Sequence, residues 1–176
     1  PILPSATIRR TRSFSGRAAA PCGDPMSHES FMEAALEEAR RGGASGEVPI
    51  GAVLVVEGRI VAGACNQPIT NTDPTAHAEI LVLREAARVL GSYRLLGATV
   101  YVTVEPCLMC VGALVHARVG DVVYGASEPK TGALVSAVRG LDLPGLNHHF
   151  AVTGGVLEEP CRLLVQEFFR ERRRSV

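Results

Sequence analysis

The stretch Pro106-Cys107-Leu108-Met109-Cys110, read together with His77-Ala78-Glu79 thirty residues upstream, decides how this chain is organised. Cysteines at positions i and i+3 on the first turn of a helix point the same way, so both sulfurs can reach one ion. Two thiolates and one imidazole leave the fourth position of a zinc ion open for water, which is the catalytic arrangement. A nearby glutamate can handle the protons of that water. The sequence therefore predicts a zinc site of His77, Cys107 and Cys110, with Glu79 as the catalytic residue.

A lone pair of cysteines with this spacing also has other uses. It occurs in redox motifs and as one half of a zinc ribbon. A zinc ribbon needs a second such pair, which the chain lacks, and a redox motif has no need of His77 and Glu79. The remaining alternative is a histidine of the protein core beside two buried thiols.

Length and composition indicate one globular domain. With 176 residues, 47% of them hydrophobic and 20% charged, the chain can bury a sizeable core and has an ordinary composition. No uncharged apolar run approaches the ~18 residues of a membrane span. The five cysteines are odd in number and scattered apart from one pair. This usage favours a reducing compartment with a metal site over a disulfide framework, and we expect a cytoplasmic protein.

The net charge of zero conceals an uneven distribution. Residues 1–25 carry four arginines and one aspartate, and residues 162–176 carry five arginines and two glutamates, so each segment has a net charge of +3. The part between them, 26–161, has a net charge of −6. An acidic middle argues against a protein that coats nucleic acid generally, but it leaves room for a basic footprint at the C-terminus.

Residues 1–25 are rich in Arg, Ser, Ala and Pro and show no sustained apolar period. We expect a disordered N-terminal extension here, followed by a single domain over residues 26–176. A transit-type peptide is an alternative, because such peptides are rich in Arg and Ser and poor in acids. Another is upstream sequence from a misplaced start, with Met26 opening the protein.

Strands and helices alternate through the remainder of the chain. Apolar residues from Phe31 to Ala39 recur at helical steps, and Gly42-Gly43 are expected to end this helix. Pro106 fits the first turn of a later helix, and Gly125 is expected to open a loop. The alternation predicts an α/β fold, a three-layer α/β/α sandwich with a mixed central sheet of about five strands. The expected helices after the first are 75–90, 106–117 and 157–174, and the expected strands are 50–56, 59–65, 98–104, 119–124 and 151–154.

These residues carry a family resemblance. His77-Ala78-Glu79 with Pro106-Cys107-x-x-Cys110 resembles the zinc-dependent nucleobase and nucleoside deaminases, which have the cytidine-deaminase-like fold. A wider set of segments resembles the bacterial tRNA-specific adenosine deaminases and extends from about Ser30 to Arg174. That set comprises Asn66-Gln67-Pro68, the segments 73–80, 93–95, 101–107 and 130–133, Asn147-His148 and Phe168-Phe169-Arg170.

The resemblance implies an enzyme that converts adenosine to inosine at the wobble position of a tRNA anticodon. Zinc-activated water would attack C6 of the base, and Glu79 would act as the proton shuttle. One Zn²⁺ per subunit would be held by His77, Cys107 and Cys110. Because members of the family are usually homodimers, the anticodon loop is expected to lie across two subunits.

The resemblance also implies contacts with the RNA. Asn66 would contact the ribose or base and the Ala78 amide would orient the base, although an asparagine here could simply cap a turn. Glu128 stands where the family more usually has Asp, and Ser127 replaces an expected basic residue, so these two contacts depart from the pattern. The other implied contacts are Asn147 beside the loop, Phe168 or Phe169 by stacking, and Arg172, Arg173 and Arg174 by charge.

Two other functions fit part of the same pattern. A deaminase of a free nucleobase or nucleoside, of the guanine or cytosine type, would act without RNA and would be indifferent to losing Arg172–Arg174. A zinc-stabilised RNA-binding module would have no turnover at all, so Glu79→Ala would leave inosine formation unchanged.

Overall fold

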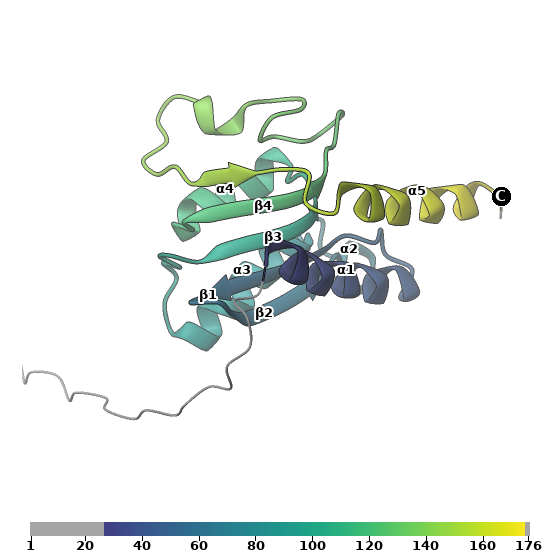
Figure 1. The fold of residues 1–176 in the computed structure, drawn as a ribbon, viewed down its shortest axis with the longest axis horizontal. Coiled ribbons are helices and arrows are strands. Elements are labelled where there is room, and N and C mark those ends of the chain that lie inside the picture. Colours follow the sequence, from purple (N-terminus) through teal and green to yellow (C-terminus); the bar gives the residue numbers. More distant parts are fainter. Residues whose placement is uncertain (1–26, 175–176) are drawn as a thin grey trace, which may run out of the picture.

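Five strands form one mixed sheet in the order β2-β1-β3-β4-β5 (Figure 1). The computed structural model describes residues 27–174, so the extension expected over 1–25 lies outside the described residues. Strand β1 pairs antiparallel with both β2 and β3, whereas β3, β4 and β5 are parallel to one another. The strands are β1 (Gly51–Val56), β2 (Arg59–Cys65), β3 (Thr99–Val104), β4 (Asp121–Ala126) and β5 (Ala151–Thr153).

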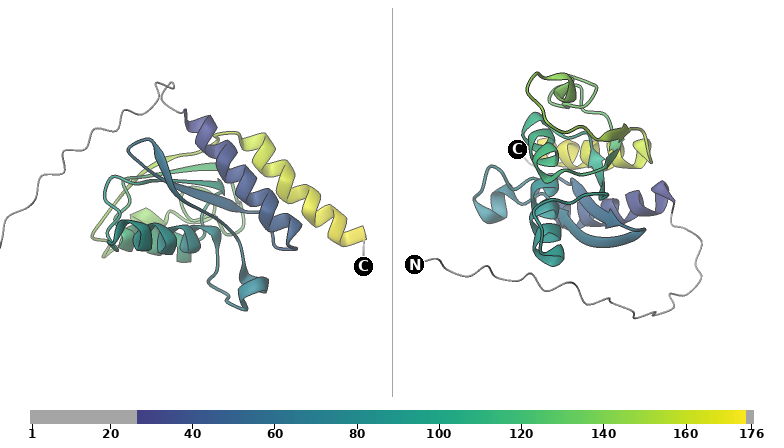
Figure 2. Two further views of the ribbon diagram at one scale, coloured as in Figure 1. Left: turned by 90° about the horizontal axis from the view of Figure 1, so that it is seen from below. Right: turned by 90° about the vertical axis from the view of Figure 1, so that its left-hand side faces the viewer.

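Helices cover both faces of this sheet, which confirms the predicted three-layer sandwich. Helices α1 (His28–Ala44) and α5 (Glu158–Arg174) lie side by side on one face, and α3 (Ala78–Leu90) and α4 (Leu108–Ala117) cover the other (Figure 2). Two short helices, α2 (Pro68–Asn71) and the 3-10 helix η1 (Gly140–Asp142), lie in the loops. Among residues 27–174 there is no helix with the length and apolar character that a membrane span requires.

The near-continuous apolar runs of the central strands reflect burial on both sides. In β3, Val100 and Val102 belong to the core beneath α3 and α4, while Tyr101 packs with residues of α1 on the opposite face. Successive side chains of a strand point to opposite faces, so a strand between two helical layers needs apolar residues at nearly every position. The expected strand 98–104 is therefore the buried central strand β3 of the sheet.

The turn between β1 and β2 is a tight two-residue hairpin. Glu57 has φ of 50° and Gly58 has φ of +71°, and positive φ at both central residues is the type I′ pattern of two-residue hairpins. This turn sets the antiparallel register, with Val56 opposite Arg59.

Some expected boundaries were wrong, because packing outweighs local signals. Gly42-Gly43 do not end α1, which continues to Ala44; a Cβ on Gly42 would lie 3.0 Å from Cys65 Cβ, so glycine here permits close approach to β2. Gly125 lies within β4 and opens no loop. A Cβ at this position would lie 2.4 Å from the Cys161 sulfur, so glycine here permits the close approach of α5. Pro106 lies outside α4, and Cys107 takes the N-cap position after it.

Candidate active site

The three predicted zinc ligands meet at the edge of the sheet where β3 ends. His77 is the N-cap residue of α3, Cys107 is the N-cap residue of α4, and Cys110 lies in the first turn of α4. Two helix N-termini therefore converge on one point, where exposed N–H groups and the positive helix dipoles favour anionic ligands.

The distances within this group fit a zinc ion. Cys107 Sγ lies 3.7 Å from Cys110 Sγ, and His77 Nδ1 lies 3.6 Å from Cys107 Sγ and 3.5 Å from Cys110 Sγ. Tetrahedral zinc with bonds of about 2.3 Å to sulfur and about 2.0 Å to nitrogen separates two sulfurs by roughly 3.8 Å and sulfur from nitrogen by roughly 3.5 Å. The ligand atoms are thus arranged as a tetrahedral ion would require, with a fourth corner left over.

The protonation of the two thiols also suits a metal. The hydrogen bond between the Cys107 and Cys110 sulfurs, together with the nearby His77 imidazole, lowers the pKa of the Cys107 thiol to about 4. The same contact with Cys107, and burial, raise the pKa of Cys110. Thiolates are the ligating form, so binding of a zinc ion would release the proton of a thiol in this pair.

Glu79 is a buried carboxyl beside these ligands. It is 4% exposed and lines a cavity of about 90 Å³ with His77, Cys107, Glu128 and Thr131. Burial raises the pKa of the Glu79 carboxyl, because the charged form is disfavoured away from water. A carboxyl with a raised pKa is suited to taking up and returning a proton near neutral pH.

Asn66 and Ala78 lie together beside the metal ligands. The Ala78 N–H donates a 2.9 Å hydrogen bond to Asn66 Oδ1, and the Asn66 backbone N–H donates to Ile50. Asn66 is only 6% exposed. The asparagine therefore takes up the first free N–H of α3, and this bond fixes the segment that carries His77.

Glu105, which the sequence did not single out, lies at the end of β3 and is 3% exposed. It accepts hydrogen bonds from residues at both ends of the segment 128–136, which we call the wall segment because Glu128 and Thr131 line the cavity. Burial alone would raise the pKa of Glu105, but hydrogen bonds from Ser136, Val135 and Glu128 hold it below its usual value. The donors are the N–H groups of Glu128, Leu134, Val135 and Ser136 and the Ser136 hydroxyl.

Glu47 holds the loop on the other side of the site in a similar way. Its carboxylate is 2% exposed and accepts from the Ile69 N–H at 3.3 Å, the Thr70 N–H at 2.7 Å and the Thr70 hydroxyl at 2.8 Å. Burial acts to raise the pKa of Glu47, and these hydrogen bonds outweigh it, so the pKa lies below its ordinary value. The only sequence signal for both residues was a glutamate beside an apolar strand.

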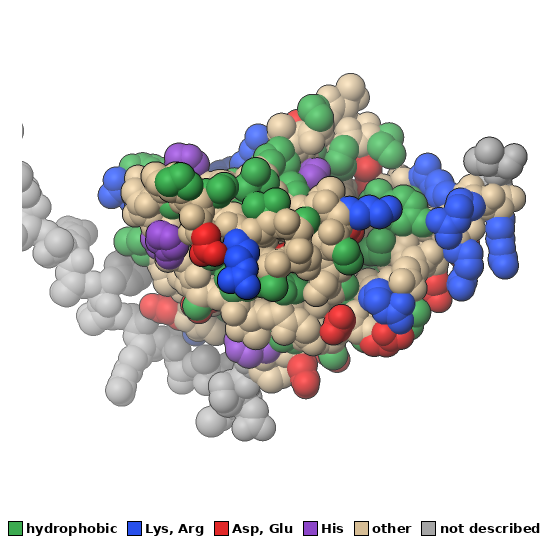
Figure 3. Space-filling view, turned by 90° about the horizontal axis from the view of Figure 1, so that it is seen from above, with side chains coloured by type: hydrophobic (Ala, Val, Ile, Leu, Met, Phe, Trp, Pro, Cys, Tyr) green, Lys and Arg blue, Asp and Glu red, His purple; other side chains and the backbone are tan. Residues whose placement is uncertain are grey.

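The residues expected to contact RNA on α5 differ in their surroundings. Phe169 is 44% exposed and lines a groove of about 590 Å³ with Arg173, Lys130 and Arg170. Arg172 instead donates to the Gly46 carbonyl, and its guanidinium lies 5.0 Å from the ring centre of half-buried Phe168. Figure 3 shows basic side chains gathered where α5 ends.

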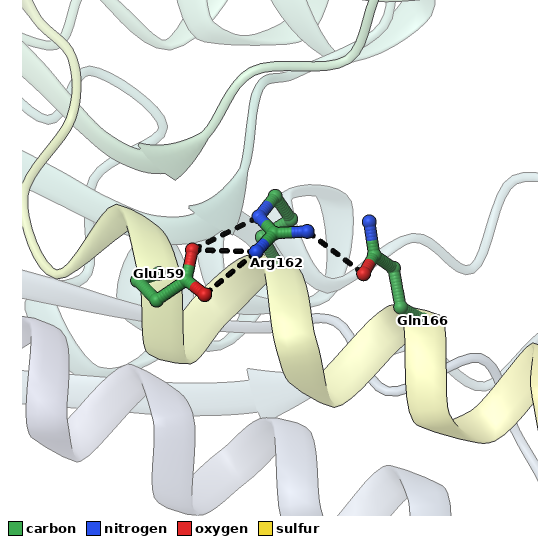
Figure 4. Close-up of polar contacts among 3 residues, drawn as sticks. All are labelled: Glu159, Arg162 and Gln166. Atoms are coloured by element: carbon green, nitrogen blue, oxygen red, sulfur yellow. Dashed lines mark hydrogen bonds and ion pairs between the residues drawn. The ribbon is translucent and has the colours of Figure 1, made fainter.

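The preceding turns of α5 carry an internal polar network. Arg162 makes two-pronged contacts with Glu159 and a 2.8 Å hydrogen bond to Gln166 (Figure 4). Its charge is therefore partly balanced within the helix, and the strongly basic surface is confined to the last turns.

Asn147 lies away from this site within the same subunit. Its carbonyl accepts a 2.7 Å hydrogen bond from Arg118, and His148 Nε2 contacts the Val119 carbonyl at 2.7 Å. Arg118 and Val119 precede β4, whereas the metal ligands lie where the parallel strand β3 ends. Strands of six residues separate these edges by roughly 20 Å.

Comparison with known proteins establishes the class. Residues 25–126 match the family model of the cytidine and deoxycytidylate deaminase zinc-binding region. With its five-stranded mixed sheet and its His/Cys/Cys group, the chain is a zinc-dependent deaminase of the cytidine-deaminase-like fold. A tRNA-specific adenosine deaminase of Bacillus subtilis is 49% identical over 147 residues, covering 84% of this chain and 91% of that protein. The chain belongs to the family of tRNA-specific adenosine deaminases.

Solved structures support this placement. One, from a study of A-to-I editing by tRNA:A34 deaminases at the wobble position of transfer RNA, is 48% identical with a TM-score of 0.75, and the match covers 76% of this chain and 97% of that one. A guanine deaminase from Bacillus subtilis is 36% identical with a TM-score of 0.57, over 72% of this chain and 83% of that one. The predicted fold and resemblance are both confirmed, and a free-base specificity is not favoured.

Proposed function

We propose that this enzyme hydrolyses adenosine to inosine at the wobble position of a tRNA anticodon. The observation that carries the proposal is the buried carboxyl of Glu79 in the same cavity as His77 and Cys107, which form a ligand group with Cys110. Relatives with this substrate in their names are nearly half identical over most of the chain.

In the proposed mechanism, His77, Cys107 and Cys110 hold one Zn²⁺. When bound, the ion supplies a water molecule of lowered pKa for attack on C6 of the base. Glu79 would accept one proton from that water and pass it to the neighbouring ring nitrogen. It would then take the second proton from the attacking oxygen and deliver it to the departing amine. The C6–N bond breaks, the water oxygen remains on C6, and the products are inosine and ammonia.

Recognition of the RNA is assigned to the surface around this cavity. Phe169 is exposed enough to stack on an unpaired base, and Arg173, Arg170 and Lys130 line the same groove at positions suited to phosphates. Arg172 contributes by holding α5 against the Gly46 carbonyl. Asn66 and Glu128 remain the proposed contacts to the flipped nucleotide and its neighbour.

We also propose that the enzyme is a homodimer. An apolar groove of about 650 Å³ runs between α3 and α4 and is lined by Leu83, Ala87, Tyr93, Met109 and Ala113. Tyr93 is 70% exposed in the single chain, and a second copy would cover it. In such a dimer Asn147, distant from the metal ligands of its own subunit, would contact RNA bound by the other. The described cysteines are all free thiols, which is consistent with a cytoplasmic enzyme.

The proposal is tested by incubating the zinc-loaded full chain with an anticodon stem-loop RNA and, separately, with free adenosine, guanine and cytidine. We expect inosine at the wobble position of the RNA and no change in the free compounds, measured by mass spectrometry of the digested RNA. Deamination of a free compound without reaction of the RNA would refute the proposal. Formation of a stable RNA complex with no inosine would indicate a binding module.

A further inference from the structure

The buried carboxylate of Glu105 has no part in the proton transfers, yet it is the most heavily bonded side chain near the cavity. Oε1 accepts the N–H groups of Leu134 at 3.1 Å, Val135 at 2.8 Å and Ser136 at 2.9 Å. Oε2 accepts the Glu128 N–H at 3.1 Å and the Ser136 hydroxyl. A buried carboxylate with this many donors is held in one orientation, and it holds its donors in turn.

These donors come from the two ends of the wall segment, residues 128–136. Within the segment the Gly132 N–H donates to the Glu128 carbonyl at 2.8 Å. Gly132 lies directly on the carboxylate, because a Cβ there would be 2.5 Å from Glu105 Oε2. The Glu105 side chain thus fixes the positions of both ends of the wall segment and its close packing at Gly132.

The wall segment is also attached to the metal-binding strand end. Gly132 forms a backbone bridge with Cys107, and the Ala133 N–H donates to the Pro106 carbonyl at 2.8 Å. Glu105 directly precedes Pro106, so one short stretch of chain carries both the carboxylate that bonds the wall segment and the proposed zinc ligand Cys107. A change at Glu105 therefore reaches the cavity through the wall segment.

Three side chains of the wall segment, Glu128, Lys130 and Thr131, face the substrate side. Glu128 and Thr131 line the cavity that contains Glu79, and Lys130 lines the basic groove beside α5. The Glu128 carboxylate accepts the Lys130 N–H at 2.9 Å, which fixes these two residues relative to each other. The segment therefore joins the pocket for the base to the surface for the backbone of the RNA.

We propose that Glu105 is a positioning residue that sets affinity for the target nucleotide by holding the wall segment against the cavity. The inference rests on the proposed function. Glu105 lines the cavity, but its carboxylate oxygens are bonded to the wall segment and it is not one of the proposed zinc ligands, so its loss should weaken substrate binding far more than the chemical step. A residue needed only for folding would lower the amount of active enzyme and leave KM unchanged.

The main test is Glu105→Gln in the full zinc-loaded chain, with Glu85→Gln as the matched control. Glutamine keeps the shape, but its amide nitrogen faces N–H donors and cannot accept from them. We expect KM for the stem-loop RNA to rise about tenfold or more, with kcat within about threefold and one zinc per chain. Glu85 pairs with exposed Arg88 on α3, so its variant should match the parent enzyme. An unchanged KM, or a fall in kcat alone, would overturn the inference.

A milder variant guards against misfolding of the first. Ser136→Ala removes one donor and leaves the four backbone N–H groups in place. We expect KM to rise about threefold and the amides of residues 134–136 to exchange with solvent faster, while the amides of α3 exchange as before. If Ser136→Ala changes neither KM nor exchange, the inference is wrong. The exchange measurement needs no RNA, so it separates this inference from the proposed function, which fails if the parent enzyme makes no inosine.

Discussion

Glu79 and Glu105 line the same cavity and are almost equally buried, at 4% and 3% exposure. Their pKa values are nevertheless shifted in opposite directions. Burial raises the pKa of Glu79, whereas the N–H and hydroxyl donors around Glu105 more than compensate for its burial and lower its pKa. Depth alone therefore does not decide what a buried carboxyl does. A buried carboxyl that accepts several hydrogen bonds stays ionised and fixes the segment that donates them. A buried carboxyl whose pKa is set mainly by desolvation can take up a proton.

The difference follows from where each residue sits. Glu79 lies in the first turn of α3 and faces the proposed metal ligands, while Glu105 follows β3 and faces the backbone of the wall segment. Glu47 provides a third case, since it is 2% exposed and accepts from Ile69 and Thr70. Its lowered pKa places it with Glu105.

The largest expected effect comes from Glu79→Gln, which removes the proton carrier and keeps its shape. We expect kcat to fall about 10²–10⁴-fold, the usual contribution of a general acid–base group. Zinc content and Tm should not fall, because the raised pKa shows that burial disfavours the ionised carboxylate. Single-turnover assays with stem-loop RNA, atomic absorption and calorimetry measure the three quantities. Activity within tenfold of the parent enzyme would contradict the role of Glu79.

Removal of the metal should act on stability as well as on activity. At a free zinc concentration 1,000 times the dissociation constant, binding stabilises the folded protein by about 4.1 kcal/mol, and chelation removes this. We expect a lower Tm after dialysis against a chelator, with recovery on adding zinc. The Cys110→Ser variant should start from the lower Tm and respond little to either treatment. Equal Tm values with and without zinc would show that the ion is not held by this group.

Glu47→Gln tests whether hydrogen bonds keep a carboxyl ionised outside the active site. Losing an acceptor for buried donors costs about 1–3 kcal/mol, so the free energy of unfolding should fall at pH 7. Because the folded pKa lies below the ordinary value of 4.5, the stabilisation is present above that value and is lost as the pH falls through the folded pKa. Urea unfolding from pH 7 to pH 3 should show the difference shrinking in acid. A difference in the free energy of unfolding that grows in acid would show that the pKa of Glu47 is not lowered in the folded protein.

The smallest expected effect is that of Thr70→Val, which removes one of the three donors to Glu47. The hydroxyl bond is worth about 1 kcal/mol, and its loss should also bring the pKa of Glu47 closer to its ordinary value. The effect on unfolding should therefore be about half that of Glu47→Gln and should fade in the same pH range. The surface carboxyl of Glu85 again serves as the comparison, and Glu85→Gln is expected to leave the free energy of unfolding unchanged within the error of the measurement.

The ligand group could be predicted from the sequence because its signals are local. Cys107 and Cys110 are neighbours on one helical turn, and the apolar runs of β1, β3 and β4 are visible residue by residue. The end of α1 and the interior of β4 were misjudged because Gly42 and Gly125 usually signal turns. Here each glycine makes room for a cysteine on another element, and a sequence does not show that neighbour.

The two structural carboxylates could not be predicted for a related reason. Glu105 bonds residues 23 to 31 positions away, and Glu47 bonds Thr70 at 23 positions. Their position beside an apolar strand is a weak signal, and it does not reveal the distant N–H donors that each carboxylate bonds. The short helix α2 was missed as well, because Pro68 at its start and a polar composition are equally typical of a loop.

The bonds from Glu105 to the wall segment have a consequence for how the enzyme can change over generations. Four of the five donors are backbone N–H groups, which every amino acid except proline carries. The path of the segment is therefore largely independent of which side chains it bears. Positions such as Lys130 and Thr131 can be exchanged one at a time on a scaffold that keeps its shape. Evolution or design can thus alter which nucleotides the enzyme accepts without first changing the residues of the catalytic site.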